Sequence, residues 1–531
     1  MFGQMMDQPL LISSILEFAI KFHGGVEVVT RTVEGPIVRS TWREVGRRAT
    51  RLAHALTALG IGPGDRVATL AWNTQRHLEL YFAVSGIGAV LHTINPRLSP
   101  EQLAYVVDDA QDALVFYDTT FAPLARLVEG RPSVRRTIAL NEAEYEALLE
   151  GHPDTITWPA LDERAASSLC YTSGTAGHPK GVVYSHRSTV LHSYAVAMVD
   201  ALAISGGDVT LPVVPMFHVN AWGVPYAAAM VGSKLVLPGP GLDGASLHAL
   251  IESERVTALL GVPTVWMNLL AHVRSVGGAL GSVERVVVGG SAASPALIAA
   301  FEGYGARVVH AWGMTEMSPL GTANRLLPKH AALDSDAQMA IKAKQGRPLF
   351  GVDLRIVDDA GAALPHDGAT SGHLEVRGPW VASGYFNQPQ SDAHHDGWFA
   401  TGDIATIDAD GYMTITDRSK DVIKSGGEWI SSIELENTAM GCPGVAAAAA
   451  VGLPHPKWVE RPLLVVVRAP GAEVDAAQVG AHLAARLPKW WLPDAVEFVD
   501  ALPLGATGKV LKRALRERFA GYTFAEPPTG R

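Results

Sequence analysis

The chain has little cysteine and no excess of positive charge. Among its 531 residues only Cys170 and Cys442 are cysteines, and they lie far apart. This excludes a disulfide framework and a cysteine-based metal site, and it fits a reducing compartment, so we expect a cytoplasmic protein. The formal net charge of −10 argues against nucleic-acid binding, because contact with phosphates requires a basic surface.

A long hydrophobic run is also missing. The apolar residues of 10–16 are interrupted by Ser13 and Ser14 and followed by Glu17 and Lys21. No basic segment precedes a long apolar core, so we expect an amphipathic helix here and neither a signal peptide nor an integral membrane span. Hydrophobic residues make up 48% of the chain and charged residues 18%, which is typical of a globular protein. The length predicts roughly two to four domains.

The most distinctive stretch is 172–181, which reads Thr-Ser-Gly-Thr-Ala-Gly-His-Pro-Lys-Gly. Glycines let backbone N–H groups approach an anion, hydroxyls add donors, and Lys180 supplies a mobile positive charge. The stretch is not a Walker A motif, because Pro179 precedes the lysine and a glycine follows it. Alone it would fit a plain surface loop equally well. Its flanks at 165–171 and 181–184 are strand-like, so we predict a phosphate-binding loop within a β-hairpin.

Strand-like and helix-like segments alternate over much of the chain. A helix is predicted over 40–60, with Thr41 as its N-cap and Glu44 three residues later. Alternation of this kind predicts parallel α/β sheets. The other expected helices are 77–86, 247–254 and 294–304, and the expected strands are 67–70, 113–117, 133–140, 258–260, 283–288 and 308–310.

From about Asp353 the pattern becomes β-rich, with alternating segments and Asp-Gly turns. Short α/β units return after Arg418. The predicted fold class is α/β, with a large N-terminal domain of parallel α/β sheets plus a small β-rich subdomain over 1–417, and a small α+β domain over 418–531. The alternating segments are 354–357 and 373–376, and the Asp-Gly turns lie at 367–368, 396–397 and 410–411.

Several further stretches combine aromatic, hydroxyl, acidic and basic residues. They are Ala-Trp-Gly-Met-Thr-Glu at 311–316, Thr-Gly-Asp at 401–403, Asp-Arg-Ser-Lys at 417–420, Lys-Ser-Gly-Gly-Glu-Trp at 424–429 and Thr-Gly-Lys at 507–509. In this order, together with the loop at 172–181, they resemble the acyl-adenylate-forming superfamily of acyl-CoA synthetases, luciferases and adenylation domains. The resemblance spans roughly 41–516, and its strength lies in the number and order of the motifs.

Within that superfamily the chain is most similar to bacterial fatty-acyl-CoA synthetases, through 215–222, 425–433 and 454–462. The segment 312–319 resembles the medium-chain branch and its relatives acting on methylthiopropionate. The resemblance implies an ATP-dependent fatty acid–CoA ligase that forms acyl-AMP, releases pyrophosphate and acylates CoA. A ligase for methylthiopropionate or another short or aryl acid stays open. Acylation of a carrier protein, and the binding of an acyl-nucleotide without turnover, are two further functions that we weigh against it.

The resemblance also implies roles for individual residues. Lys509, Glu316, His218 and Thr172 would be catalytic, and Thr172 and Glu316 would place Mg²⁺, which prefers oxygen ligands. His218, Trp222, Val262 and Pro263 would form the acyl pocket. The residues expected to bind ATP or CoA are Thr172, Ser173, Gly174, Thr175, Gly177, Lys180, Val219, Gly290, Ser291, Ala292, His310, Ala311, Trp312, Gly313, Met314, Thr315, Asp403, Arg418, Lys420, Lys424, Gly427 and Trp429.

Ordinary structural explanations exist for several of these residues. A glutamate such as Glu316 can be a surface acid at a helix start, Asp403 can be a turn residue, and His218 and Trp222 can simply pack in a core. Ser291 is not predicted to be a hydrolase nucleophile, because an alanine stands where the second flanking glycine belongs. The adjacent histidines at 394–395 are expected in a solvated turn.

The resemblance further implies that the C-terminal domain is mobile and rotates between the two steps. Lys420 matches the hinge position, Lys509 would face the substrate in the first state, and Gly427 would line the pantetheine tunnel in the second. The implied partners are a small carboxylic acid, ATP and CoA, with no nucleic acid. The oligomeric state is open, although members of the resembled family are often homodimers.

Overall fold

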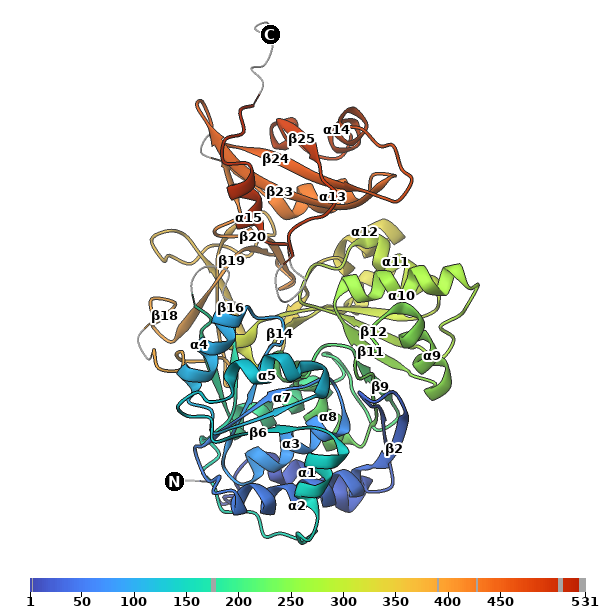
Figure 1. Ribbon diagram of the computed structural model, residues 1–531. Helices are drawn as coiled ribbons and strands as arrows, with labels where there is room; N and C mark the ends of the chain where they lie inside the picture. Colours follow the sequence, from blue (N-terminus) through green and yellow to red (C-terminus); the bar gives the residue numbers. More distant parts are fainter. Residues whose placement is uncertain (2, 173–177, 389–390, 426–427, 505–509, 525–531) are drawn as a thin grey trace, which may run out of the picture. The chain divides into compact units, whose positions relative to one another are not determined.

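The computed structural model describes residues 1, 3–172, 178–388, 391–425, 428–504 and 510–524 (Figure 1). The chain divides into two compact units, Met1–Asp353 with Arg377–Phe399, and Leu354–Val376 with Ala400–Arg531. The chain passes from one unit to the other within strands β16, β17 and β19. A functional boundary at 417/418 stays a prediction.

A six-stranded sheet in the first unit has the order β6-β5-β3-β4-β7-β8. Its neighbours are parallel except β7 and β8, which pair antiparallel. Helices α4 (Pro100–Ala110) and α5 (Ala122–Val128) pack on it through a buried apolar cluster. The strands are β3 (Arg66–Leu70), β4 (Val90–Thr93), β5 (Leu114–Tyr117), β6 (Arg136–Ala139), β7 (Ala166–Tyr171) and β8 (Gly181–Ser185).

A nine-stranded sheet in the same unit has the order β15-β14-β13-β12-β11-β9-β10-β1-β2. Its central strands run parallel, which confirms the predicted parallel α/β architecture. Helices α9 (Gly244–Glu254), α10 (Pro263–Ser275) and α11 (Pro295–Gly303) pack along it (Figure 1). The strands are β1 (Glu27–Arg31), β2 (Ile37–Thr41), β9 (Val209–Pro212), β10 (Lys234–Leu237), β11 (Ala258–Gly261), β12 (Arg285–Val288), β13 (Arg307–Gly313), β14 (Leu320–Ala323) and β15 (Arg347–Pro348).

The helices of the first unit include every one predicted from the sequence. The predicted cap of α2 is confirmed, because the Thr41 hydroxyl accepts a hydrogen bond from the Glu44 N–H at 3.3 Å. In the described part of the chain, no helix combines the length and the apolar character that a membrane crossing requires. The remaining helices are α1 (Ile12–His23), α2 (Trp42–Ala58), α3 (Gln75–Gly86), α6 (Ala147–Leu149), α7 (His186–Ala197), α8 (Val224–Val231), α9 (Gly244–Glu254), α10 (Pro263–Ser275), α11 (Pro295–Gly303) and α12 (Ser335–Lys342).

A buried asparagine joins the two large sheets. Asn73, which follows β3, donates from Nδ2 to the C=O groups of Pro212 and Val214, each at 2.9 Å. Its Oδ1 accepts from the Met216 N–H at 2.7 Å. An amide buried without partners is costly, so these bonds fix the segment after β9, which leads into the candidate site.

A buried ionic network ties α2 to α3. Arg48 lies 2.7 Å from Glu79 Oε1 and 2.8 Å from Glu146 Oε2. The hydroxyl of Tyr145 donates to Glu79 Oε2 at 2.6 Å. Glu79 and Tyr145 are both fully buried, and such charges are stable in an interior only when they are paired and hydrogen-bonded.

The second unit contains the rest of the predicted β-rich segment and a separate sheet. Within it, β19 and β20 pair antiparallel, and a further sheet has the order β22-β21-β24-β23 with β25 on β24. The helices of the second unit are α13 (Ser432–Met440), α14 (Ala476–Ala484) and α15 (Lys512–Arg518). The strands are β16 (Asp353–Val357), β17 (Gly372–Arg377), β19 (Trp398–Ile407), β20 (Met413–Arg418), β21 (Ile423–Ser425), β22 (Glu428–Ile430), β23 (Val445–His455), β24 (Val459–Arg468) and β25 (Ala495–Phe498).

The histidines at 394–395 agree only in part with the prediction of a solvated turn. They form the short strand β18 (His394–His395), which pairs with the start of β19. Asp396 and Gly397 make the turn, with φ values of 50° and 75°, and they and His395 are exposed, as predicted. The His394 ring lies 5.4 Å from the Tyr385 ring and 4.9 Å from the Phe399 ring. Packing between these rings keeps His394 partly buried, so the prediction is wrong for this residue.

Candidate active site

The glycine-rich stretch begins and ends on a β-hairpin, as predicted. Tyr171 in β7 lies opposite Gly181 in β8. The Thr172 N–H donates to the Lys180 C=O at 2.9 Å, and the Lys180 N–H donates to Thr172 Oγ1 at 3.2 Å. The loop therefore starts and ends on a closed pair of hydrogen bonds. The predicted loop residues Ser173, Gly174, Thr175 and Gly177 lie outside the described residues.

Glu316 is buried close to this hairpin. It lies in the short helix η4 (Thr315–Met317) and is 6% exposed. The Tyr385 hydroxyl donates to Glu316 Oε1 at 2.8 Å, and Lys180 Nζ lies 4.7 Å from the centroid of the same tyrosine ring. The structure thus connects Thr172, Lys180 and Glu316 through a residue that sequence reasoning missed, because a single tyrosine outside a motif gives no signal.

The donors near the hairpin fit Mg²⁺. The residues that the structure describes contain no group of three or more His, Cys, Asp or Glu side chains that could hold a metal ion. The donors expected from the sequence are only the Glu316 carboxylate and the Thr172 hydroxyl. Mg²⁺ retains several waters and is usually bound by one or two carboxylates together with substrate phosphates. One buried carboxylate beside a loop that is expected to bind phosphates is compatible with that preference.

The ends of β12 and β13 bring two predicted groups of residues together. A Cβ atom added to Gly289 would lie 3.0 Å from the Trp222 ring and 3.2 Å from the Ala311 carbonyl oxygen. One added to Gly290, where φ is 76°, would lie 3.2 Å from Val262 Cγ1. The expected acyl-pocket residues Trp222 and Val262 are therefore neighbours of the glycines and the alanine expected beside adenine.

Three further members of these groups are half-buried or exposed in the same region. Pro263 is the first residue of α10, where a proline loses no helical hydrogen bond, and it is half-buried. Ala292 is half-buried in the loop after β12, and Ser291 is exposed. The Ser291 hydroxyl donates to the Gly290 C=O at 2.9 Å, so no base activates it, as expected for a residue that is not a nucleophile.

His310 is a buried connector in β13. Its Nε2 accepts from the Ala293 N–H at 3.3 Å, and its Nδ1 donates to the Ala343 C=O at 3.0 Å. Burial lowers the pKa of His310 to about 4, so the ring is neutral and can accept at one nitrogen while donating at the other. The imidazole thereby fixes the loop after β12 against β13. Its expected contact with adenine stays a prediction.

Trp312 is the aromatic residue expected to stack on adenine. It is 8% exposed, and a Cβ atom added to Gly321 would lie 2.8 Å from its ring. Only a glycine leaves space for the indole at this point of β14. The position of the ring therefore depends on the absence of a side chain in the neighbouring strand.

The turn after Trp312 is fixed by backbone contacts. A Cβ atom on Gly313 would overlap the Pro319 carbonyl oxygen, and the Met314 N–H donates to that oxygen at 3.1 Å. The Tyr184 hydroxyl donates to the Thr315 C=O at 2.6 Å. These contacts attach the turn to β8 and determine where η4, and with it Glu316, begins.

The residues expected at the acyl entrance lie on unusual backbone. Val219, Asn220, Ala221 and Trp222 have φ values of 46°, 47°, 49° and 57°, and Gly223 follows at 72°. For residues with a Cβ atom this left-handed conformation costs roughly 1–2 kcal/mol each. Such a run persists only where the surroundings hold it, and it is typical of functional sites.

Asn220 attaches this left-handed turn to β7. Its Nδ2 donates to Ser168 Oγ at 2.7 Å, and its Oδ1 accepts from Cys170 Sγ at 3.3 Å. Burial raises the pKa of Cys170 to about 11, so its thiol stays protonated and can donate. Thr93 Oγ1 lies 3.3 Å from the same sulfur. Sequence reasoning missed Asn220, although an asparagine tolerates left-handed backbone better than most residues.

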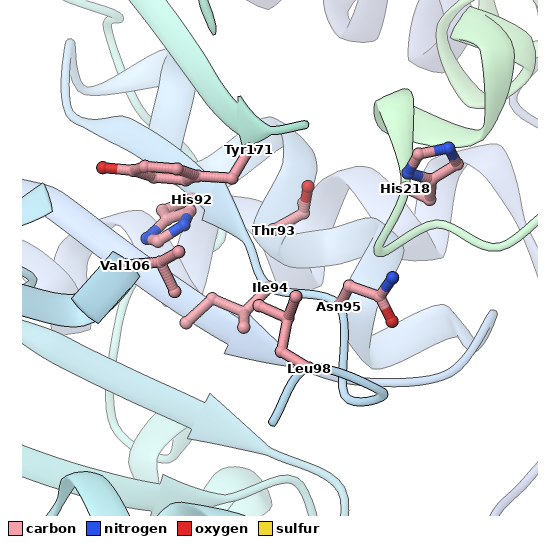
Figure 2. Close-up of a pocket in the computed structure, with 8 residues that line it drawn as sticks. All are labelled: His92, Thr93, Ile94, Asn95, Leu98, Val106, Tyr171 and His218. Carbon is pink, nitrogen blue, oxygen red and sulfur yellow. The ribbon is translucent and has the colours of Figure 1, made fainter. Parts of the chain in front are cut away.

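A small cavity lies beside His218 (Figure 2). Its volume is about 10 Å³, and its lining consists of His92, Thr93, Ile94, Asn95, Leu98, Val106, Tyr171 and His218. That is space for about one water molecule and not for an acyl chain. His218 lies across the cavity from the neighbouring rings of His92 and Tyr171 (Figure 2). Its role at the acyl entrance stays a prediction.

In the second unit the two expected ribose ligands meet. Asp403 and Arg418 are partners across β19 and β20, with Arg418 Nε 2.8 Å from Asp403 Oδ1. Asp403 is 2% exposed. Arginine neutralises this buried carboxylate and leaves it a hydrogen-bond acceptor, as the ribose role requires.

The other predicted residues of the second unit are more exposed. The Lys420 C=O accepts from Arg516 Nη2 at 3.2 Å. Lys424 is exposed and lies opposite Trp429 in the hairpin of β21 and β22. The Trp429 ring lies 6.1 Å from the His373 ring. Gly427 and Lys509 lie outside the described residues.

Known proteins resemble the whole chain. The family model described as "AMP-binding enzyme" matches residues 19–386, and the model described as "AMP-binding enzyme C-terminal domain" matches residues 434–509. The 3-methylmercaptopropionyl-CoA ligase of Ruegeria lacuscaerulensis is 55% identical over 98% of this chain and 99% of its own length. The medium-chain-fatty-acid–CoA ligase of Ectopseudomonas oleovorans is 52% identical over 98% of each chain.

A solved structure agrees with this similarity. The anthranilate CoA ligase AuaEII in complex with anthranoyl-AMP aligns with a TM-score of 0.86 and 26% identity, covering 96% of this chain and 98% of that one. The fold described above is therefore that of acyl-adenylate-forming enzymes.

The left-handed turn generates a test of stability. Asn220→Ala removes the bonds to Ser168 and Cys170, which should cost about 1–3 kcal/mol, and forces alanine into left-handed backbone. Asn220→Gly removes the same bonds but tolerates the backbone, so it should be about 1 kcal/mol more stable than Asn220→Ala. Urea unfolding of both variants measures the difference. An alanine variant as stable as the glycine variant would show that this residue is not left-handed in solution.

Proposed function

This chain belongs to the AMP-binding enzyme family, and from that premise we propose that it is an ATP-dependent ligase that joins a medium-length aliphatic acid to coenzyme A. Because its relatives are acyl-CoA ligases, this chain is an AMP-forming acid–thiol ligase. We choose a medium-length acid because the chain is 52% identical, over nearly its whole length, to a medium-chain-fatty-acid–CoA ligase.

In the proposed first step the acid's carboxylate attacks the α-phosphate of ATP and pyrophosphate leaves. The step brings anions together, so it needs cations and oriented N–H groups at the phosphates. The loop at 172–181 would supply both, with Lys180 as its cation. Glu316 and Thr172 would hold Mg²⁺, which when bound neutralises charge on the phosphates. Lys509 would bridge the carboxylate and the α-phosphate.

The nucleoside would be held by two groups of residues. Gly290, Ala311 and Trp312 would contact adenine. Asp403 would accept hydrogen bonds from the ribose hydroxyls, with Arg418 beside it. Trp222 and Val262, which lie against the glycines after β12, would form the start of the acyl pocket, so that the acid's carboxylate ends near the nucleotide.

In the proposed second step the CoA thiol attacks the acyl carbon, forms the thioester and displaces AMP. We propose that residues 418–531 form a mobile domain that rotates about Lys420 between the steps. Gly427 would then line the pantetheine path, where a side chain would obstruct it. Cys170 and Cys442 are both free and buried, which supports a reducing compartment such as the cytoplasm.

One specific observation favours a second acid. The 3-methylmercaptopropionyl-CoA ligase of Ruegeria lacuscaerulensis is 55% identical to this chain, slightly more than the medium-chain enzyme. A thioether-containing acid of similar length to a short fatty acid is therefore the second candidate substrate.

A substrate screen tests the proposed acid. Straight-chain acids of three to sixteen carbons, 3-methylthiopropionate and cinnamate are compared by AMP release with ATP, Mg²⁺ and CoA. We expect the highest kcat/KM for a medium-length acid such as octanoate. Equal or better turnover of palmitate would contradict the chain length, and a clear preference for 3-methylthiopropionate would establish the second candidate. AMP from none of the acids would contradict the ligase itself.

The two steps should depend on different residues outside the first unit. Lys509→Ala should lower acyl-adenylate formation about 10²–10³-fold, by analogy with the loss of one oxyanion donor, yet still transfer a supplied acyl-adenylate to CoA. Gly427→Leu should form adenylate and stall with CoA, because the leucine fills the pantetheine path. Pyrophosphate exchange measures the first step, and thioester formation from synthetic acyl-AMP measures the second.

Parallel losses of both steps in both variants would contradict domain rotation and indicate a destabilised domain. The same assays test the two other functions considered above, the binding of an acyl-nucleotide without turnover and the acylation of a carrier protein. A binding protein without turnover shows no exchange, and a carrier-protein ligase shows exchange but no thioester with free CoA.

A further inference from the structure

We propose that Tyr385 is a positioning residue that orients the metal-binding carboxylate of Glu316 and the phosphate-loop lysine Lys180 at the same time. The inference rests on the proposed function, in which Glu316 binds Mg²⁺ and Lys180 binds the triphosphate. It adds that one side chain fixes the distance between these opposite charges.

Two parts of the Tyr385 side chain make the two contacts. Its hydroxyl donates to Glu316 Oε1 at 2.8 Å, and its ring face lies 4.7 Å from Lys180 Nζ. Tyr385 is 8% exposed, and Glu316 is 6% exposed, so the hydrogen bond is screened little by water. The hydroxyl orients the carboxylate, while the negative face of the ring attracts the ammonium.

The backbone around Tyr385 is tied to both partners. The Ala382 N–H donates to the Glu316 C=O at 2.7 Å, and the Phe386 N–H donates to the Gly181 C=O at 2.8 Å. Gly181 directly follows Lys180 in the chain. The segment 382–386 is therefore anchored at the carboxylate on one side and at the end of the phosphate-binding loop on the other, with the tyrosine between them.

A neighbouring ring limits the movement of the Tyr385 side chain. The His394 ring packs edge-on at 5.4 Å from the tyrosine ring, which restricts its rotation.

Variants of Tyr385 can separate the two contacts. Tyr385→Phe keeps the ring beside Lys180 but removes the bond to Glu316. Changes to residues that orient a metal ligand typically cost about 10–100-fold in metal affinity, so the Mg²⁺ concentration for half-maximal stabilisation of the ATP complex should rise about tenfold. ATP affinity in EDTA should stay at the wild-type value.

Tyr385→Leu removes both contacts. Its Mg²⁺ requirement should match that of Tyr385→Phe, and its ATP affinity in EDTA should fall a further two- to fivefold, which is about the contribution of an exposed cation–π contact. The probes are Mg²⁺ and ATP themselves. The readouts are the ATP-dependent shift in melting temperature across a Mg²⁺ titration and the ATP dissociation constant from calorimetry, so neither depends on turnover.

Tyr145→Phe is the matched control. It removes a buried tyrosine hydroxyl that donates to a glutamate, Glu79 Oε2 at 2.6 Å, in the same unit but in the α2–α3 network. It should lower the melting temperature without changing the Mg²⁺ titration. Glu316→Gln should abolish the Mg²⁺ response and sets the upper limit of the effect.

Each result decides the inference. An unchanged Mg²⁺ titration in Tyr385→Phe, or an equal shift in Tyr145→Phe, would overturn the orientation of Glu316. ATP affinities in EDTA that are equal for the Phe and Leu variants would overturn the contact with Lys180. A wild-type protein that binds no ATP would contradict the proposed function, and the inference with it, whereas normal ATP binding with unaffected variants would overturn the inference alone.

Discussion

The antiparallel pairing of β7 with β8 holds the groups of the candidate site at fixed distances. β7 supplies Ser168 and Cys170, which form hydrogen bonds with Asn220 in the left-handed turn. β8 supplies Tyr184, which donates to the turn before Glu316. The hairpin ends on hydrogen bonds between Thr172 and Lys180, at either end of the glycine-rich stretch. Disruption of this pairing would separate the residues that we propose for nucleotide, metal and acyl binding.

Stabilising and functional roles are divided between two kinds of buried polar group. Asn73 and the Arg48–Glu79 pair have their partners within the fold, and they stabilise the sheets and helices. Glu316 is a buried carboxylate that accepts a hydrogen bond from the Tyr385 hydroxyl at Oε1. A carboxylate in an environment of low dielectric attracts a cation strongly, which would suit the Mg²⁺ role that we propose for Glu316.

Strain is concentrated at the acyl side of the site. The run of left-handed residues from Val219 to Gly223 is unfavourable for L-residues, and buried bonds to Asn220 offset part of its cost. The turn places Trp222 against the glycine after β12. The absence of a side chain at that glycine is what lets the indole lie there. If Trp222 forms the acyl wall, as we propose, its preorganised position would reduce the ordering that substrate binding must impose.

Sequence patterns predicted the elements well and the contacts poorly. Hydrophobic periodicity and turn residues identified the parallel strands, and composition placed the loop at 172–181 on a hairpin, because these signals are local. Tyr385 and Asn220 were missed, since each acts through partners distant in the chain. In Val-Asn-Ala-Trp only the asparagine tolerates left-handed backbone, so the sequence does not predict a run of four left-handed residues before a glycine. His394 was assigned to solvent because its ring partners lie on other segments.

We propose that this chain activates a carboxylate as an acyl-adenylate. The most direct measurement mixes stoichiometric enzyme with ATP, Mg²⁺ and octanoate in the absence of CoA, and then separates the nucleotides by chromatography. We expect up to one octanoyl-AMP per chain with matching pyrophosphate, and conversion to octanoyl-CoA and AMP when CoA is added. Formation of ADP, or AMP release that does not require the acid, would contradict it.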